Sequence, residues 1–202
     1  MRADDVMTTP AITVTPETTV KYAASLLASH GFTALPVVDD DDRLIAIVTE
    51  VDLVRDRFPW DTRNRWQIDD ESPRVPPGQR VADVMTTPVT AMGATTDVAD
   101  LVTAMGDSKV RSMPIVDGSR VVGIVTRQDL VRVIGRADEA IERDVRHALA
   151  LYGGGDRWRV DVRDGVVSLG DEYDDETERH VAVVLAEAVP GVLAAQVTPI
   201  RH

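Results

Sequence analysis

The sequence predicts an α+β fold in which two β-α-β-β-α repeats pack as a pseudo-two-fold pair, followed by a small α-β-β-α-β domain. Three observations support this. The hexapeptide DVMTTP at residues 5–10 recurs at 83–88. Patterns typical of strands and helices follow in the same order after each copy. Residues 137–202 then follow a different order. A repeat at a fixed period indicates one structural unit used twice, and predicts paired clefts between the halves.

The repeat extends well beyond the hexapeptide. Residues 20–39 align on 98–117 without a gap. One residue is then missing from the second copy, and residues 47–54 match 124–131. The two copies therefore share their secondary structure throughout.

Each copy contains five helices or strands and one polar turn. A short extended segment is followed by a helix that Thr or Asp can cap and that glycine interrupts. A buried strand, a polar turn, a second strand and a closing helix complete the unit. In the first copy these are residues 11–14, a helix from Val20 to Gly31, 35–38, 39–43, 44–48 and a helix after Thr49; in the second they are 89–92, a helix from Val98 to Gly106, 113–116, 117–120, 121–125 and a helix after Thr126.

Matched apolar positions predict the shared core of the two repeats. The expected buried residues are Leu35, Val37, Ile45, Ile47, Met113, Ile115, Val122 and Ile124. Residues 58–80 interrupt the repeats with several prolines. Because Trp60 and Trp66 in this segment are large aromatics, we expect the segment to lie over a face of the paired repeats or of a dimer.

Residues 137–202 predict a separate domain. Residues 137–152 have an amphipathic helical pattern with one apolar face: Ile141, Val145, Ala148, Leu149 and Tyr152. A strand with alternating Trp158, Val160 and Val162 leads to Asp164-Gly165, a strong hairpin signal, and a returning strand. A second helix follows, with Val181, Val184, Leu185 and Ala188 as its apolar positions, and then a last strand at 193–197.

The composition excludes several classes of function. The net charge of −12 argues against nucleic-acid binding. Without cysteine, disulfides and thiolate chemistry are excluded. The four histidines show no metal-binding spacing, and no nucleophile–base motif occurs, so an enzyme is the weakest hypothesis. The first residues lack an apolar segment and no long apolar run occurs, so we expect a cytoplasmic protein.

Residues 1–136 strongly resemble a tandem pair of CBS domains, often called a Bateman module. The resemblance rests on the two VMTTP openings, the strands containing Pro36 and Pro114, and the closing I-V-T-x-x-D elements. It implies CBS domains at 1–57 and 81–136, with a linker at 58–80. Residues 137–202 look like a BON domain, from residues 164–169 and 189–192. That family usually has a glycine where this chain has Asp171.

The T-x-x-D element has a physical rationale as a nucleotide site. Thr49 and Thr126 each precede a helix, whose first N–H groups attract phosphate. The resemblance implies that Asp52 and Asp129 accept the ribose hydroxyls. Threonine and aspartate at a helix start are also ordinary caps, so this alternative stays open.

The two candidate clefts differ. Thr13 and Val14 keep the family pattern that would line an adenine slot in the first copy. The second copy has Arg111 and Arg127, either of which could bind a phosphate through its guanidinium. The second copy therefore suits phosphate better, and the first suits the base better.

The resemblance implies a regulatory module that binds AMP, ADP, ATP or S-adenosylmethionine, requires no cofactor, and signals to an unknown protein partner. The acidic chain favours a mono- or diphosphate. The alternative is a non-catalytic scaffold with degenerate clefts and a BON-like recruitment domain; membrane contact through that domain is the less favoured mode. Apolar residues in the closing helices, at 51–54 and 130–134, predict a homodimer through isologous contact.

Overall fold

The computed structural model describes residues 1–55, 57, 78–153, 157–171 and 176–199. Their contacts divide the chain into two compact units. One comprises Met1–Met7, Thr95–Ala104 and Val125–His202, and the other comprises Thr8–Ala94 and Met105–Ile124. The predicted packing of Trp60 and Trp66 lies outside the described residues.

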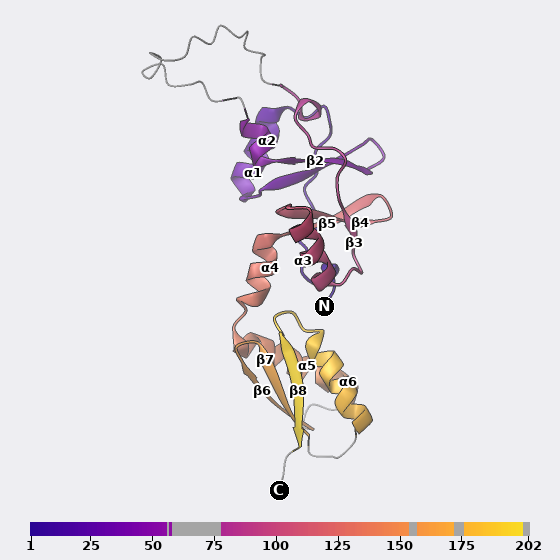
Figure 1. The fold of residues 1–202 in the computed structure, drawn as a ribbon, viewed down its shortest axis with the longest axis vertical. Coiled ribbons are helices and arrows are strands. Elements are labelled where there is room, and N and C mark those ends of the chain that lie inside the picture. The colour runs from indigo at the N-terminus through magenta and orange to yellow at the C-terminus, as the bar shows by residue number, and fades with distance from the viewer. Residues whose placement is uncertain (56, 58–77, 154–156, 172–175, 200–202) are drawn as a thin grey trace, which may run out of the picture. The chain divides into compact units, whose positions relative to one another are not determined.

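The first repeat places two helices against an antiparallel strand pair (Figure 1). The helices are α1, Val20–His30, and α2, Glu50–Val54; the strands are β1, Ala34–Val38, and β2, Leu44–Thr49. The Thr19 hydroxyl accepts from the N–H of Tyr22 at 3.2 Å, and Gly31 ends α1 with a φ of 68°. The expected limits of α1 are therefore confirmed. The expected strand at 11–14 is wrong in its extent, because only Val14 bridges to Val37.

The second repeat contains the expected elements, although its first strand covers Met92–Gly93 rather than residues 89–92. They are β3, Met92–Gly93; α3, Val98–Asp107; β4, Ser112–Asp117; β5, Arg120–Thr126; and α4, Arg127–Ile134. The sheet order is β3-β4-β5, and Met92 pairs with Ile115 in parallel. This pair lies 78 residues after the Val14–Val37 bridge, so the same contact forms in both repeats.

The openings of the two repeats are exchanged. Thr8 pairs with Ile124 of the second repeat, and Thr86 pairs with Ile47 of the first. The 3-10 turns η1, Ala3–Asp5, and η3, Val81–Asp83, are exchanged in the same sense. The N–H of Ala3 donates to Thr96 O at 2.9 Å, and that of Val81 donates to Thr18 O at 2.8 Å. Equivalent backbone contacts therefore form in both repeats.

The core prediction for the repeats is largely right. Leu35, Val37, Met113, Ile115 and Ile124 are buried, but Ile45, Ile47 and Val122 are only half-buried. In β2 the fully buried side chains are Ala46 and Val48. Successive side chains of a strand point to opposite faces. The small Ala46 therefore occupies the core face, and the two isoleucines lie on the other.

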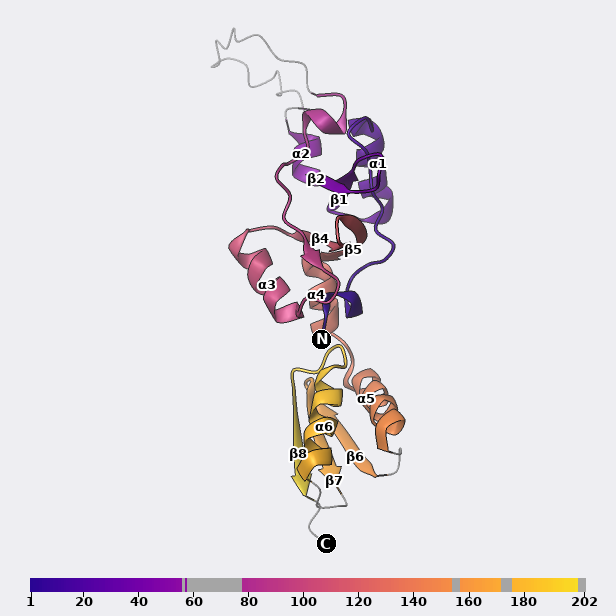
Figure 2. The same cartoon turned by 90° about the vertical axis from the view of Figure 1, so that its right-hand side faces the viewer.

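Residues 138–199 form the expected α-β-β-α-β order. The elements are α5, Asp138–Gly153; β6, Trp158–Arg163; β7, Val166–Asp171; α6, Glu176–Glu187; and β8, Ala194–Pro199. Strand β7 lies between antiparallel β6 and parallel β8, and both helices cover one face of the sheet (Figure 2). Asp164 and Gly165 have φ angles of 49° and 74°, which confirms the hairpin.

The helices of this domain bury apolar faces that partly differ from the prediction. Ile141, Val145 and Leu149 are buried as expected, whereas Tyr152 is exposed at the end of α5. In α6 the buried residues are Ala182 and Ala186, while Val184 is exposed. Small residues on α6 allow close approach to the sheet and to α5.

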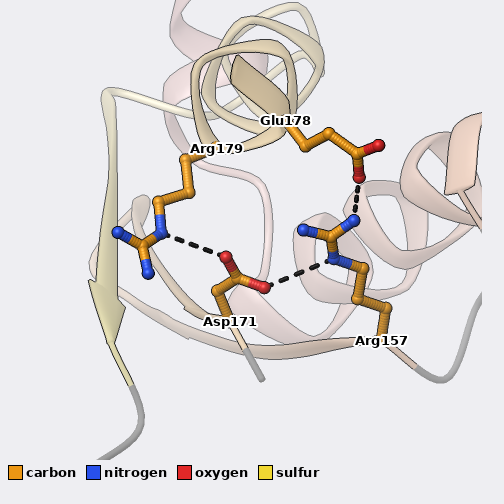
Figure 3. A network of polar contacts seen from close by, with 4 residues as sticks. All are labelled: Arg157, Asp171, Glu178 and Arg179. Atoms are coloured by element: carbon orange, nitrogen blue, oxygen red, sulfur yellow. Dashed lines mark hydrogen bonds and ion pairs between the residues drawn. The ribbon is translucent and has the colours of Figure 1, made fainter. Parts of the chain in front are cut away.

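Asp171 is a buried charged residue at the end of β7 (Figure 3). Its side chain is fully buried, and its two oxygens pair with Arg157 Nε at 3.3 Å and Arg179 Nε at 3.0 Å. Arg157 also pairs with Glu178 and lies 4.9 Å from the centre of the Trp158 ring. A buried carboxylate is costly unless it is paired and hydrogen-bonded. The network therefore makes aspartate acceptable at this position and ties β7 to α6.

Among the described residues, no helix is long and apolar enough to cross a bilayer.

Candidate functional site

The first repeat brings Thr13, Val14 and Pro36 together through its backbone. The N–H of Val14 donates to Pro36 O at 3.0 Å, and Val14 O accepts from Val38 at 2.9 Å. Val14 and Pro36 are buried, and Thr13 is half-buried. The segment expected to line an adenine slot is therefore fixed along β1.

Thr49 and Asp52 are joined at the start of α2. The N–H and the hydroxyl of Thr49 donate to Asp52 Oδ2 at 2.9 and 2.7 Å. This satisfies the backbone N–H at the helix cap. The capping alternative left open by the sequence is thus realised in the geometry. One carboxylate oxygen, Oδ1, does not take part in these two bonds.

Thr126 and Asp129 repeat the arrangement at the start of α4. The corresponding distances are 2.9 and 2.6 Å, and the N–H of Asp129 also lies 3.3 Å from the Thr126 hydroxyl. Asp129 is buried, and its Oδ1 accepts from Arg132 Nη1 at 2.9 Å. Both oxygens of Asp129 therefore accept hydrogen bonds, whereas the bonds described for Asp52 involve only Oδ2.

The two arginines expected at the phosphate lie in different surroundings. Arg111 pairs with Glu50, the first residue of α2, at 3.6 Å, with both side chains exposed. Arg111 was expected at the phosphate of the second repeat. This contact instead places its guanidinium at the start of α2, the closing helix of the first repeat. Arg127 is exposed at the first residue of α4, and Pro114 is buried in β4.

Sequence reasoning did not identify Glu50 or Arg132 as parts of these sites. The spacing of Arg132 three residues after Asp129 was an available signal, since residues at i and i+3 of a helix are neighbours. The Glu50–Arg111 pair had none, because it joins different repeats. In the described part of the chain, no group of three or more His, Asp or Glu side chains is arranged to hold a metal ion.

A family model described as "CBS domain" matches residues 3–57 and 81–136. The chain belongs to the CBS-domain family. Its CBS pair is similar to two solved structures. One is CBSX2, an Arabidopsis thaliana protein, in complex with AMP: identity is 30%, the TM-score is 0.53, and 65% of this chain and 93% of that chain are covered.

The other is the CBS domain pair of protein MJ0100, in complex with 5′-methylthioadenosine and S-adenosyl-L-methionine. Here identity is 25%, the TM-score is 0.54, and the match covers 67% of this chain and 96% of that one. A relative in sequence is the uncharacterized protein MJ1404 of Methanocaldococcus jannaschii, 31% identical over 186 residues. The match takes in 91% of this chain but only 39% of that protein's length.

Proposed function

We propose that the CBS pair is a regulatory module that binds an adenine nucleotide or a related adenosine compound such as S-adenosylmethionine. The observation that carries the proposal is the Thr–Asp arrangement present at the start of both closing helices, at Thr49–Asp52 and Thr126–Asp129. Its support comes from two similar CBS structures, one holding AMP and the other two adenosine derivatives.

In the first site, Thr13, Val14 and Pro36 would line the base. Asp52 would accept a ribose hydroxyl through Oδ1 while Oδ2 keeps the cap. We assign Arg111 to the phosphate end of this site, because it reaches Glu50 at the first residue of α2. Its weak, exposed pairing can be exchanged for a phosphate at little cost.

In the second site, Thr126 and Arg127 would face phosphate, and Asp129 would face ribose. Arg132 already donates to Asp129 Oδ1, so a ribose hydroxyl would share that oxygen with the arginine or displace it. The net charge of −12 opposes a polyphosphate. We therefore propose that AMP or ADP binds more tightly than ATP.

Calorimetric titration with AMP, ADP, ATP and S-adenosylmethionine tests this function. Asp52→Ala and Asp129→Ala should each weaken one class of sites by about ten- to a hundredfold, since a hydrogen bond to a charged group contributes about 1.5–3 kcal/mol. Asp161→Ala, an exposed position of β6, is the matched control. No heat with any of these compounds at millimolar concentration would refute the sensor function.

The alternative function is a non-catalytic scaffold, and the engagement of both Asp129 oxygens favours it for the second site. Residues 137–202 would then be the recruiting part. We propose that this part is BON-like, supported by its α-β-β-α-β order. We keep 58–80 as the linker between CBS domains at 1–57 and 81–136.

We also propose a homodimer. Val51 and Val54 on α2, and Val131 and Ile134 on α4, are each at least half exposed, although they are apolar. A second copy could cover such surface by isologous contact. Light scattering over a micromolar range should give twice the mass of 22.0 kDa; a monomer throughout would exclude the dimer.

A further inference from the structure

Three loops interlock at the end of the C-terminal domain that follows α4. They are the α4–α5 junction, residues 135–137; the β6–β7 hairpin, residues 164–165; and the turn before β8, residues 190–193. We call these loops the interlocked end. All of them belong to the same compact unit as α4.

Arg136 connects the elements of the interlocked end through hydrogen bonds of its side chain. Its guanidinium donates to Pro190 O and to the Asp144 carboxylate, and its side chain is about three-quarters buried. The junction is only three residues long, between Ile134 at the end of α4 and Asp138 at the start of α5. One side chain therefore joins the junction to α5 and to the turn before β8.

Gly191 brings the same turn against α4 itself. Its φ is 97°, and a Cβ added there would lie 3.2 Å from Val133 O in α4 and 2.9 Å from Ile141 Cδ1 in α5. The turn thus lies so close to α4 and α5 that position 191 has no room for a side chain.

The β6–β7 hairpin contacts both α5 and the turn before β8. The N–H groups of Asp164 and Gly165 donate to the Asp138 carboxylate at 2.7 and 3.0 Å. A Cβ added to Gly165 would lie 2.9 Å from Gly191 O, and Leu193 N–H donates to Gly165 O at 2.9 Å. Hairpin, turn and both helices are therefore held by close backbone contacts and by the side chains of Arg136 and Asp138, which leaves little freedom for one to move alone.

Helix α4 has eight residues, so its two ends are about 12 Å apart. Thr126 caps its N-terminus and Asp129 lies in its first turn, and its last turn carries Val133, whose carbonyl oxygen lies close to Gly191. We infer that α4 transmits the state of the Thr126–Asp129 site to the C-terminal domain through the interlocked end, so that this domain is the element the second CBS site regulates. This inference rests on the proposed nucleotide-sensing function, and it adds which part of the chain responds when the second CBS site is occupied.

The first test needs no nucleotide. Thr126→Ala removes the cap of α4 and should speed amide hydrogen exchange of Gly165 and Leu193 by about threefold to fivefold. In an Arg136→Ala background the same substitution should have no further effect, because the tie is already broken. Thr49→Ala, the same substitution at the first repeat's cap, is the matched control and should leave both amides unchanged.

The second test adds AMP. Saturating AMP should slow exchange of Gly165 and Leu193 in the unmodified chain and leave it unchanged in Arg136→Ala, while both proteins still give binding heat. If Arg136→Ala does not fold, Arg136→Lys keeps the charge but cannot span two acceptors. Binding heat without any change at these amides would overturn the coupling and leave the sensor function standing. If no binding heat is seen, the sensor function fails. The coupling between α4 and the C-terminal domain is then decided by the nucleotide-free comparison alone. Additive effects of Thr126→Ala and Arg136→Ala on amide exchange would overturn the coupling.

Discussion

Thr86 and Ile47 exchange two backbone hydrogen bonds, 2.8 and 3.2 Å long, although Thr86 opens the second repeat and Ile47 lies in β2 of the first. Thr8 and Ile124 form the reciprocal pair at 2.9 and 3.1 Å. Each repeat is therefore completed by a strand-like segment from the other.

We predict that Thr86→Pro destabilises the protein by about 1–3 kcal/mol, because it removes the N–H that Ile47 O accepts. Thr86→Ala, which loses the side chain but keeps the N–H, should cost far less. Urea unfolding followed by circular dichroism measures both. Equal losses for the two variants would show that the exchanged pairing contributes nothing.

We predict that Asp171→Asn destabilises the C-terminal domain by about 3–5 kcal/mol, because two largely buried arginines lose their carboxylate. The control is Asp161→Asn, which removes an exposed pair with Arg163 at 3.1 Å and should cost under about 1 kcal/mol. In a background where Trp60 and Trp66 are replaced by Phe, fluorescence of Trp158, which packs on Arg157, reports unfolding of this domain. A loss at Asp171 no larger than at Asp161 would contradict the structural role of the network.

We predict a contribution of Asp83 to acid sensitivity. Hydrogen bonds from the backbone N–H groups of Arg80 and Gln79 hold the pKa of Asp83 below its ordinary value. A carboxyl whose pKa is lower in the folded than in the unfolded chain stabilises the fold above the unfolded pKa, and this contribution is lost as pH falls through the folded pKa.

Asp83→Asn should therefore flatten the fall in stability below about pH 4. Unfolding midpoints measured from pH 2 to 6 test this. Because hydrogen bonds rather than distant charges are the main cause, added salt should leave most of the difference in place. Superimposable acid profiles for the two proteins would rule the contribution out.

We predict that Arg132→Ala tightens AMP binding at the second site by up to about fivefold, because it frees Asp129 Oδ1 from an exposed partner. Arg55→Ala is the matched control, since Arg55 occupies the equivalent position after Asp52 in the first repeat. Calorimetry measures both. Weaker binding by Arg132→Ala would mean that this arginine contacts the nucleotide instead.

Local features of the fold were predictable from the sequence. The caps at Thr19 and Thr49, the end of α1 at Gly31 and the hairpin at Asp164-Gly165 depend on neighbouring residues, whose patterns are visible in one chain. The paired Thr–Asp elements of the candidate sites followed from the repeat.

Contacts between distant residues were not predictable in the same way. Nothing in the pattern around Thr8 shows that it pairs with Ile124 rather than within its own repeat. Ile45 is half-buried and its neighbour Ala46 is fully buried, because successive residues of β2 face opposite sides of the sheet. An almost continuous apolar run does not indicate which of the two sides faces the core. Arg136 and Asp171 are charged residues whose burial depends on partners from other elements.

The exchanged openings determine when each repeat can form its hydrogen bonds during translation. When the first 57 residues have left the ribosome, the edge of β2 at Ile47 and the start of α1 at Thr18 still lack their partners, which lie at Val81 and Thr86. The second repeat meets no such delay, since Met1 to Thr8 already exist when Thr96 and Ile124 are made. The first repeat therefore cannot form these hydrogen bonds when its own residues are complete, because it waits for residues that the ribosome adds about thirty positions later, whereas the second repeat finds its partners already made.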